Sequence, residues 1–89
     1  MNNLKISLII PVYNGEKYIR ETIESVLSQN YSNIEIIVID GNSTDHTKSI
    51  IESFQDLITI FISENDFGQT DAINKGFSFA TGEIINWLN

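Results

Sequence analysis

The sequence predicts an α/β fold in which a parallel sheet carries helices on both faces. Apolar stretches rich in Ile and Val alternate along the 89-residue chain with segments of helical periodicity, in the order β-α-β-α-β-α-β. The first strand, expected over 5–12, is apolar at nearly every position, which is typical of a strand covered on both faces. Parallel neighbours need crossover connections, which are nearly always right-handed. We therefore expect a Rossmann-like three-layer α/β/α parallel sheet with the spatial strand order 3-2-1-4.

The expected elements follow from local signals. Pro11 has no amide donor, which places it at the end of the first strand, and Asn14 is a good N-cap for a helix over 15–29. The second strand is expected over 34–39. The later elements are a second helix capped by Ser43 or Thr44 and ending near Phe54, a third strand over 57–63, a third helix from near Asp71, Gly82 in the left-handed conformation after it, and a fourth strand over 83–88.

Composition and charge exclude several classes of protein. A hydrophobic content of 42% and a net charge of −7 indicate a folded globular protein, and 89 residues allow at most one small domain. The five Lys and Arg residues are too few and too scattered for a nucleic-acid interface, so no nucleic-acid partner is expected. The absence of Cys excludes disulfides, thiolate catalysis and zinc–thiolate sites.

The apolar runs of the chain are short. None approaches the roughly 20 residues that a membrane helix needs. No long apolar segment precedes the first strand, as a signal peptide would require. We therefore expect a protein of the cytoplasm, either free there or peripheral at the inner face of the membrane.

Polar residues gather where the first two strands end. Asp40 follows the second strand directly, and Pro11, Val12 and Tyr13 end the first. In a parallel sheet these carboxyl ends open into the crevice where ligands bind. An unpaired carboxylate there can accept hydrogen bonds from a ribose hydroxyl or a base N–H, unless Asp40 merely ends its strand. Tyr13 either stacks on a flat base or covers the edge of the sheet.

The residues after Asp40 have structural interpretations. Ser43 and Thr44 are expected as helix caps, Asp45 as a cap or first-turn residue, and His46, the only histidine, as a surface residue. No Gly-x-Gly-x-x-Gly pattern follows the first strand, so a nucleotide phosphate would have to be neutralised elsewhere. A metal ion is the usual substitute.

Four stretches, read together, point to a known family: SLIIPVYNG at 7–15, ETIESVLSQNY at 21–31, IIVIDGNSTDHT at 36–47 and SENDFGQTDAINKG at 63–76, which runs into ATGEI at 80–84. In this order and spacing they resemble the amino-terminal part of a family 2 glycosyltransferase with the GT-A nucleotide-diphospho-sugar transferase fold. The resemblance covers almost the whole chain. It implies an enzyme that transfers a sugar from a nucleotide-diphospho-sugar donor to an acceptor hydroxyl, with the acceptor unknown.

The resemblance also implies roles for single residues. The acid matching Asp40 binds the nucleobase, the aromatic matching Tyr13 stacks on it, and backbone around Pro11 and Val12 lines the same pocket. The nucleotide-binding candidates near the sugar-phosphate are Asp71 and Lys75, with Asp66 beside them. Asp71 can instead complement a helix N-terminus, and Lys75 can be a solvated charge. Ile73 stands where many members carry Arg. No catalytic residue and no metal ligand is assigned within the chain.

The resemblance implies that the metal site of the family lies C-terminal to these stretches. Its Asp-x-Asp motif directly follows the fourth strand, and 87–89 is the lead-in to it. Mg²⁺ or Mn²⁺ is therefore expected for the complete domain, with its ligands outside this chain. We expect residues 1–89 to be the donor-binding part of a glycosyltransferase domain, truncated before the motif and inactive by itself. The alternative is a non-catalytic module that binds nucleotides or self-associates through the uncovered edge of the fourth strand.

Overall fold

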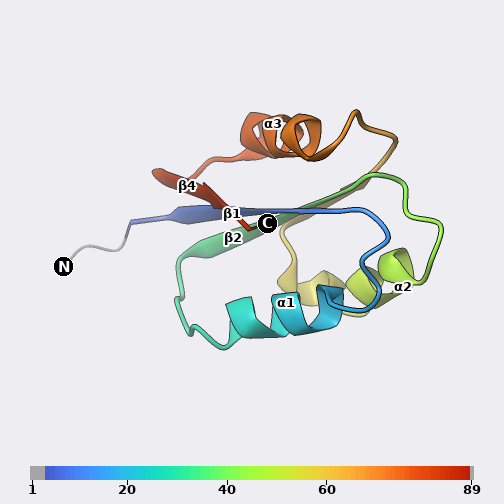
Figure 1. Ribbon diagram of the computed structural model, residues 1–89. Coiled ribbons are helices and arrows are strands. Elements are labelled where there is room, and N and C mark those ends of the chain that lie inside the picture. The colour runs from blue at the N-terminus through green and yellow to red at the C-terminus, as the bar shows by residue number, and fades with distance from the viewer. Residues whose placement is uncertain (1–3, 89) are drawn as a thin grey trace.

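The computed structural model describes residues 4–88 as one four-stranded parallel sheet with helices on both faces (Figure 1). The strands are β1 (Ile6–Val12), β2 (Ile34–Asp40), β3 (Ile60–Ser63) and β4 (Ile84–Trp87), and the helices are α1 (Ile19–Leu27), α2 (Thr47–Glu52) and α3 (Gln69–Phe79), with a 3-10 turn at Gln55–Leu57. None of the helices in this part of the chain is long and apolar enough to cross a membrane.

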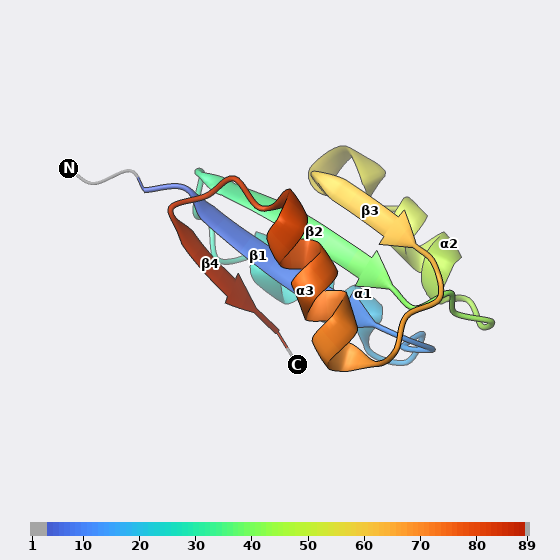
Figure 2. The same ribbon diagram turned by 90° about the horizontal axis from the view of Figure 1, so that it is seen from above.

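The helices cover the two faces of the sheet unequally. Figure 1 shows α3 on one face and α1 with α2 on the other, and Figure 2 shows α3 lying along β1 and β2. Successive side chains of a strand point to opposite faces, so β1 and β2 contribute to both layers. The layer under α1 and α2 is formed by Leu8, Ile10, Val12, Ile19, Ile23, Val26, Ile36, Val38 and Ile51, and the layer under α3 by Ile9, Ile37, Ile39 and Ala72. The predicted three-layer arrangement is confirmed.

The strand order is β3-β2-β1-β4, as predicted from the alternation of apolar strands with amphipathic helices. All three pairings are parallel. The register sets Val12 beside Asp40 at the carboxyl end of the sheet, and Ser63 of β3 lies on the other side of Asp40. The chain therefore leaves β1, β2 and β3 at the same rim, where the predicted site residues of the first two strands meet.

The first two helices begin later than predicted. Asn14 does not cap a helix, because its backbone is in the left-handed conformation (φ +48°) and the chain turns before α1 begins at Ile19. Ser43 and Thr44 likewise do not cap α2, which begins at Thr47. The side chains of Asn14 and Ser43 are engaged elsewhere, in contacts between loops that a local reading of the sequence does not show.

Two further boundaries also differ from the predictions. The third strand begins at Ile60, because Gln55–Leu57 closes a 3-10 turn in which the Leu57 N–H donates to the Phe54 carbonyl at 2.8 Å. Gly82 is not left-handed; among residues 4–88 the only glycine with a positive φ is Gly68. Gly82 is required for close packing instead, since a Cβ there would stand 2.6 Å from Ser7 Oγ.

A buried carboxylate ties the amino ends of the central strands to the turn before β4. Glu35 is 5% exposed and accepts hydrogen bonds from the Ser7 hydroxyl at 2.5 Å and the Thr81 N–H at 2.7 Å. Lys5 Nζ lies 3.4 Å from it, and the Gly82 N–H donates to Ser7 Oγ at 2.8 Å. Burial alone raises the pKa of Glu35, but the bonds from Ser7, Thr81 and Lys5 outweigh it and lower the pKa from 4.5 to about 2.

We expect this network to make the free energy of unfolding depend on pH. The pKa of Glu35 is lower in the folded state than in the unfolded chain, so its contribution is complete above pH 4.5 and is lost as the pH falls toward 2. Glu35→Gln should cost about 1–3 kcal/mol at pH 7, since the amide cannot accept all of these bonds. The substitution should also reduce the fall in the free energy of unfolding between pH 4.5 and pH 2. Urea denaturation from pH 7 to 2 measures both effects, and Glu52→Gln on exposed α2 is the matched control. Identical pH profiles for the wild type and Glu35→Gln would contradict the network.

Candidate functional site

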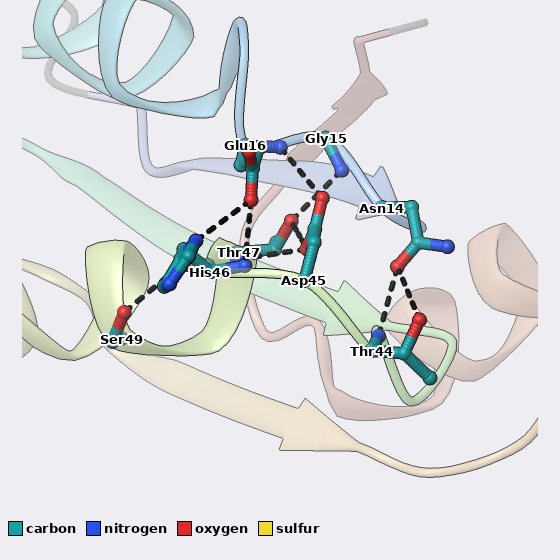
Figure 3. Close-up of polar contacts among 8 residues, drawn as sticks. All are labelled: Asn14, Gly15, Glu16, Thr44, Asp45, His46, Thr47 and Ser49. Carbon is teal, nitrogen blue, oxygen red and sulfur yellow. Dashed lines mark hydrogen bonds and ion pairs between the residues drawn. The ribbon is translucent and has the colours of Figure 1, made fainter.

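The loops that follow β1 and β2 hold each other at the carboxyl rim of the sheet (Figure 3). Asn14 Oδ1 accepts a hydrogen bond from the Thr44 N–H at 2.8 Å, and the Asn14 N–H donates to Ser43 Oγ at 2.8 Å. The Gly15 N–H donates to Thr47 Oγ1 at 2.8 Å. Bonds on both sides of Asn14 therefore stabilise its left-handed backbone and fix the exit of the chain from β1.

Two acidic side chains complete this junction. Asp45 accepts hydrogen bonds from the Thr47 N–H at 2.9 Å, the Thr47 hydroxyl at 2.5 Å and the Glu16 N–H at 3.2 Å. Desolvation raises the pKa of Asp45, but these bonds, chiefly those from Thr47, lower it overall. Glu16 Oε1 accepts from the His46 N–H at 2.8 Å and lies 3.0 Å from His46 Nδ1; the backbone bond is the largest cause of the lowered pKa of Glu16. His46 is exposed at the surface, as expected. Asp45 is neither the N-cap nor a first-turn residue of α2, because it lies one residue before the N-cap His46, although its carboxylate accepts the N–H of the first helical residue.

Asp40 lies beneath the rim. Its side chain is fully buried, and its carboxylate accepts hydrogen bonds from the Ser43 N–H at 2.9 Å, the Ser43 hydroxyl at 2.5 Å and the Ser63 hydroxyl at 2.8 Å. The expectation of an unpaired carboxylate was therefore wrong. The turn after β2 brings Ser43 back over the strand end, and the register of β3 brings Ser63 alongside. A direct contact between Asp40 and a ligand stays a prediction.

A pocket of about 550 Å³ opens at this rim. It lies between the ends of β1 and β2, the loop after β3 and the first turn of α3, and it is lined by Pro11, Val12, Tyr13, Tyr18, Gly41, Asn65, Asp66, Gly68, Gln69 and Ala72. The structure brings the predicted residues of β1 into the pocket, with Tyr13 59% exposed. Asp40, Asp71 and Lys75 are not among the lining residues.

Sequence reasoning missed much of the lining. It gave no binding role to Tyr18 and Gly41, and it named Asp66 together with Asp71 and Lys75 as candidates for contact near the sugar-phosphate. The available signal in the sequence was Gly68 itself, because glycine permits the positive φ (+110°) that the chain adopts just before α3. Tyr18 reaches the pocket because the chain turns before α1 begins, and that turn depends on the contacts between the two loops.

Lys75 and Asp71 brace the loop after β3. Lys75 Nζ lies 3.0 Å from Glu64 Oε2 and 3.7 Å from Asp71 Oδ2, and it donates to the Asn65 carbonyl at 3.0 Å. The bond with Glu64 is the main reason why the pKa of Lys75 is raised. Asp71, in the first turn of α3, accepts the Phe67 N–H at 3.0 Å. Lys75 is therefore a paired cation, and its charge is already compensated before any ligand binds.

Related sequences cover nearly all of the chain. Residues 7–89 match the family described as Glycosyl transferase family 2. The chain belongs to this family. An uncharacterised glycosyltransferase of Rickettsia typhi is 48% identical over 84 residues, which make up 94% of this chain and 26% of that protein. Glycosyltransferase GlyG of Streptococcus pneumoniae is 41% identical over 83 residues, 90% of this chain and 28% of GlyG.

Solved glycosyltransferases share the fold. The mannosyltransferase PcManGT from Pyrobaculum calidifontis, in complex with GDP-Man and Mn²⁺, superposes with a TM-score of 0.85 at 30% identity. TarS from S. aureus in complex with UDP-GlcNAc gives 0.86 at 31%. Each match covers 96% of this chain but only 27% and 26% of the respective neighbour. The expected GT-A fold is confirmed, and the chain spans about a quarter of the length of these relatives.

We expect Asp40 to stabilise the folded protein through the hydrogen bonds that it accepts at the carboxyl rim. Asp40→Ala leaves the hydroxyls of buried Ser43 and of Ser63 without their acceptor, which should lower the free energy of unfolding by about 1–3 kcal/mol. Asp56→Ala removes an exposed acid from the 3-10 turn and should change stability by less than about 0.5 kcal/mol. Urea denaturation at pH 7 compares them. A variant at position 40 that is as stable as the wild type would show that these bonds contribute nothing.

Proposed function

We propose that the protein transfers a sugar from a nucleotide-diphospho-sugar to an acceptor hydroxyl, and that residues 4–88 form the donor-nucleotide site. The observation that carries this proposal is the pocket at the carboxyl rim, with an exposed Tyr13 on its wall. It occurs in a glycosyl transferase family 2 chain whose structural neighbours include complexes with GDP-Man, UDP-GlcNAc and UDP. Ligands of parallel α/β sheets bind in such crevices.

The lining suits a nucleoside. The Tyr13 ring offers a flat apolar surface for a base, and Pro11 and Val12 extend this wall along the end of β1. Gly41 also lines the pocket, and its N–H donates to the Val12 carbonyl at 2.9 Å. Gly68 and Gln69 line the pocket where α3 begins, and the positive end of a helix dipole favours a phosphate there.

Three of the predicted nucleotide-binding residues are proposed to contribute indirectly, by positioning the loops that line the pocket. Asp40 anchors the turn that contains Gly41, and Asp71 and Lys75 brace the loop after β3. A nucleotide would therefore meet a pocket whose walls are already positioned, which reduces the entropy cost of binding. Direct contact by Asp40 with the base is the competing arrangement.

A divalent metal is expected for the complete domain, and the PcManGT neighbour contains Mn²⁺. Within residues 4–88, no group of three or more His, Asp or Glu side chains is placed to hold an ion. The pocket residues therefore do not fit a metal by themselves, and no ligand set for Mg²⁺ or Mn²⁺ is assigned among them. Their proposed contribution is to bind and orient the nucleotide. That residues 1–89 alone do not transfer sugar stays a prediction.

We expect Tyr13 to be the main stacking surface. Tyr13→Ala should weaken binding of the preferred nucleoside diphosphate, UDP or GDP, by roughly tenfold to a hundredfold, because base–aromatic stacking contributes about 1–3 kcal/mol. Tyr13→Phe keeps the ring and should bind within about threefold of the wild type. Isothermal titration calorimetry with both nucleotides measures this. If the wild type binds neither nucleotide, the proposed function fails; if Tyr13→Ala binds as tightly as the wild type, the stacking role fails.

The second candidate function is self-association through β4. All four residues of this edge strand are exposed, among them Ile84, Ile85 and Trp87 at 44%, 38% and 43%. Phe77 of α3 lies edge-on to Trp87, with 5.9 Å between ring centroids, and extends this apolar surface. The Ile84 N–H donates to the Lys5 carbonyl and the Leu88 N–H to the Ile9 carbonyl, so the amides of Ile85 and Trp87 face away from β1. The Trp87 N–H donates to Asn86 Oδ1 at 3.0 Å. An exposed apolar edge of this kind templates pairing with another chain.

If this edge mediates pairing, we expect Ile85→Lys to abolish it. A charge on the edge strand opposes strand addition, whereas the pairing between β4 and β1 is kept. Leu57→Lys, which changes an apolar residue that is 56% exposed in the 3-10 turn, is the matched control. Sedimentation equilibrium from low to high micromolar concentration should show dimers for the wild type and Leu57→Lys, and monomers for Ile85→Lys. A wild type that is monomeric throughout would remove this candidate.

A further inference from the structure

The loop after β1 contains a chemically reactive pair of residues. Asn14 is the only asparagine of the chain that is followed by glycine. Such a pair is especially prone to deamidation, because the glycine nitrogen that attacks the asparagine carboxamide has no side chain beside it to hinder the attack. Asn14 is exposed to solvent, which supplies the water that the reaction consumes. The sequence therefore places a deamidation-prone pair where the chain leaves β1.

Deamidation of this pair proceeds through a ring. The Gly15 nitrogen gives its proton to a base in solution and forms a bond to Asn14 Cγ. The bond from Cγ to the carboxamide nitrogen then breaks, and ammonia leaves with a proton taken from water. Water opens the resulting five-membered succinimide at either carbonyl, which leaves aspartate or isoaspartate at position 14. One water is consumed and one ammonia released, and no oxidant or cofactor takes part.

The conformation of Asn14 opposes the closure of this ring. Its φ of +48° lies in the left-handed region. In the left-handed helical conformation, Cβ and the nitrogen of the next residue lie on opposite sides of the Cα–C bond, whereas the ring needs them on the same side. The side chain is also held, because Oδ1 accepts hydrogen bonds from the Thr44 N–H at 2.8 Å and the Thr44 hydroxyl at 3.4 Å. Asn14 must leave both its backbone conformation and Thr44 before it reacts.

The attacking nitrogen is withheld from solvent as well. Gly15 is buried, and its N–H donates to Thr47 Oγ1 at 2.8 Å (Figure 3). Thr47 is itself fully buried, and its hydroxyl donates to Asp45 Oδ1 at 2.5 Å. A base in solution therefore reaches the Gly15 proton only when this chain of hydrogen bonds opens.

We propose that Asn14 is a deamidation site whose rate is set by opening of the junction between the loops after β1 and β2. Only the open fraction of molecules reacts, because the closed junction keeps the carboxamide and the Gly15 nitrogen apart. Isoaspartate at position 14 adds a main-chain atom between the two nitrogens that donate to Ser43 and Thr47, so both bonds cannot re-form with their present geometry. The modification therefore loosens the exit from β1 irreversibly.

The wild type alone tests the effect of the fold. The protein is incubated at mildly alkaline pH, folded and in denaturing urea, and mass spectrometry with an isoaspartate assay follows the peptide that contains position 14. Deamidation of Asn14 should be slower in the folded protein by about tenfold or more. The isoaspartate product, once separated, should unfold at a lower urea concentration than the unmodified protein. Equal deamidation rates in the two states, or a product as stable as the unmodified protein, would overturn the proposal.

Variants assign the control to the junction. Thr47→Val keeps the shape of the side chain and removes the acceptor of the Gly15 N–H, so it should raise the rate in the folded protein by roughly tenfold to a hundredfold. Thr47→Ser keeps a hydroxyl and should stay within about threefold of the wild type. Thr70→Val, the same change at an exposed position of α3, is the matched control and should leave the rate unchanged.

Global unfolding is separated from local opening by Glu35→Gln. This change weakens the hydrogen bonds at the other end of β2 and should alter the deamidation rate by less than about twofold. Amide hydrogen exchange of Gly15 in the wild type measures opening of the junction without any substitution, and should show strong protection in the folded protein. A Gly15 amide that exchanges as fast as in the unfolded chain would overturn the proposal. A folded Thr47→Val that deamidates like the wild type, or no faster than Glu35→Gln, would do the same.

Discussion

The carboxylate of Asp40 is the point at which three segments of the chain meet. A charged group taken out of water must be compensated by hydrogen bonds, and here the donors come from the turn after β2 and from the end of β3. Ser43 also accepts the Asn14 N–H, which extends the network to the loop after β1. The shape of the rim, including the place of Gly41 in the pocket lining, depends on this buried acid.

A second buried acid applies the same constraint at the other end of β2. Glu35 joins Ser7 of β1 to the turn before β4, while the residues of β2 between Glu35 and Asp40 are apolar and buried. Apolar residues of similar size tolerate a shift of register far better than a carboxylate that needs particular donors. The two acids therefore specify the alignment of the central strands, and the apolar residues between them supply most of the burial free energy.

The two sides of the pocket are held in place by different interactions. Its rigid side consists of strand ends whose loops exchange hydrogen bonds, and its braced side is the loop after β3, held by ion pairs and backbone bonds from α3. Pro11 and Tyr13 contribute apolar surface, while Asn65 and Asp66 contribute polar atoms. Such a division suits a nucleoside, whose base has flat apolar faces and a polar edge, and it agrees with the nucleotide complexes among the structural neighbours.

The sequence alone determined the elements and their order, because the alternation of apolar strands with amphipathic helices is a local signal and the crossover rule leaves few topologies. It also predicted that Tyr13 and the end of β2 share one rim. Only the tertiary structure decided how the polar residues are used. The partner Ser63 of Asp40 lies 23 positions away in the chain, and the contact between Asn14 and Thr44 spans 30. Hydrogen bonds between such distant residues leave no periodic trace in a sequence, so which acid is buried and which faces the pocket becomes visible only once the strands are side by side.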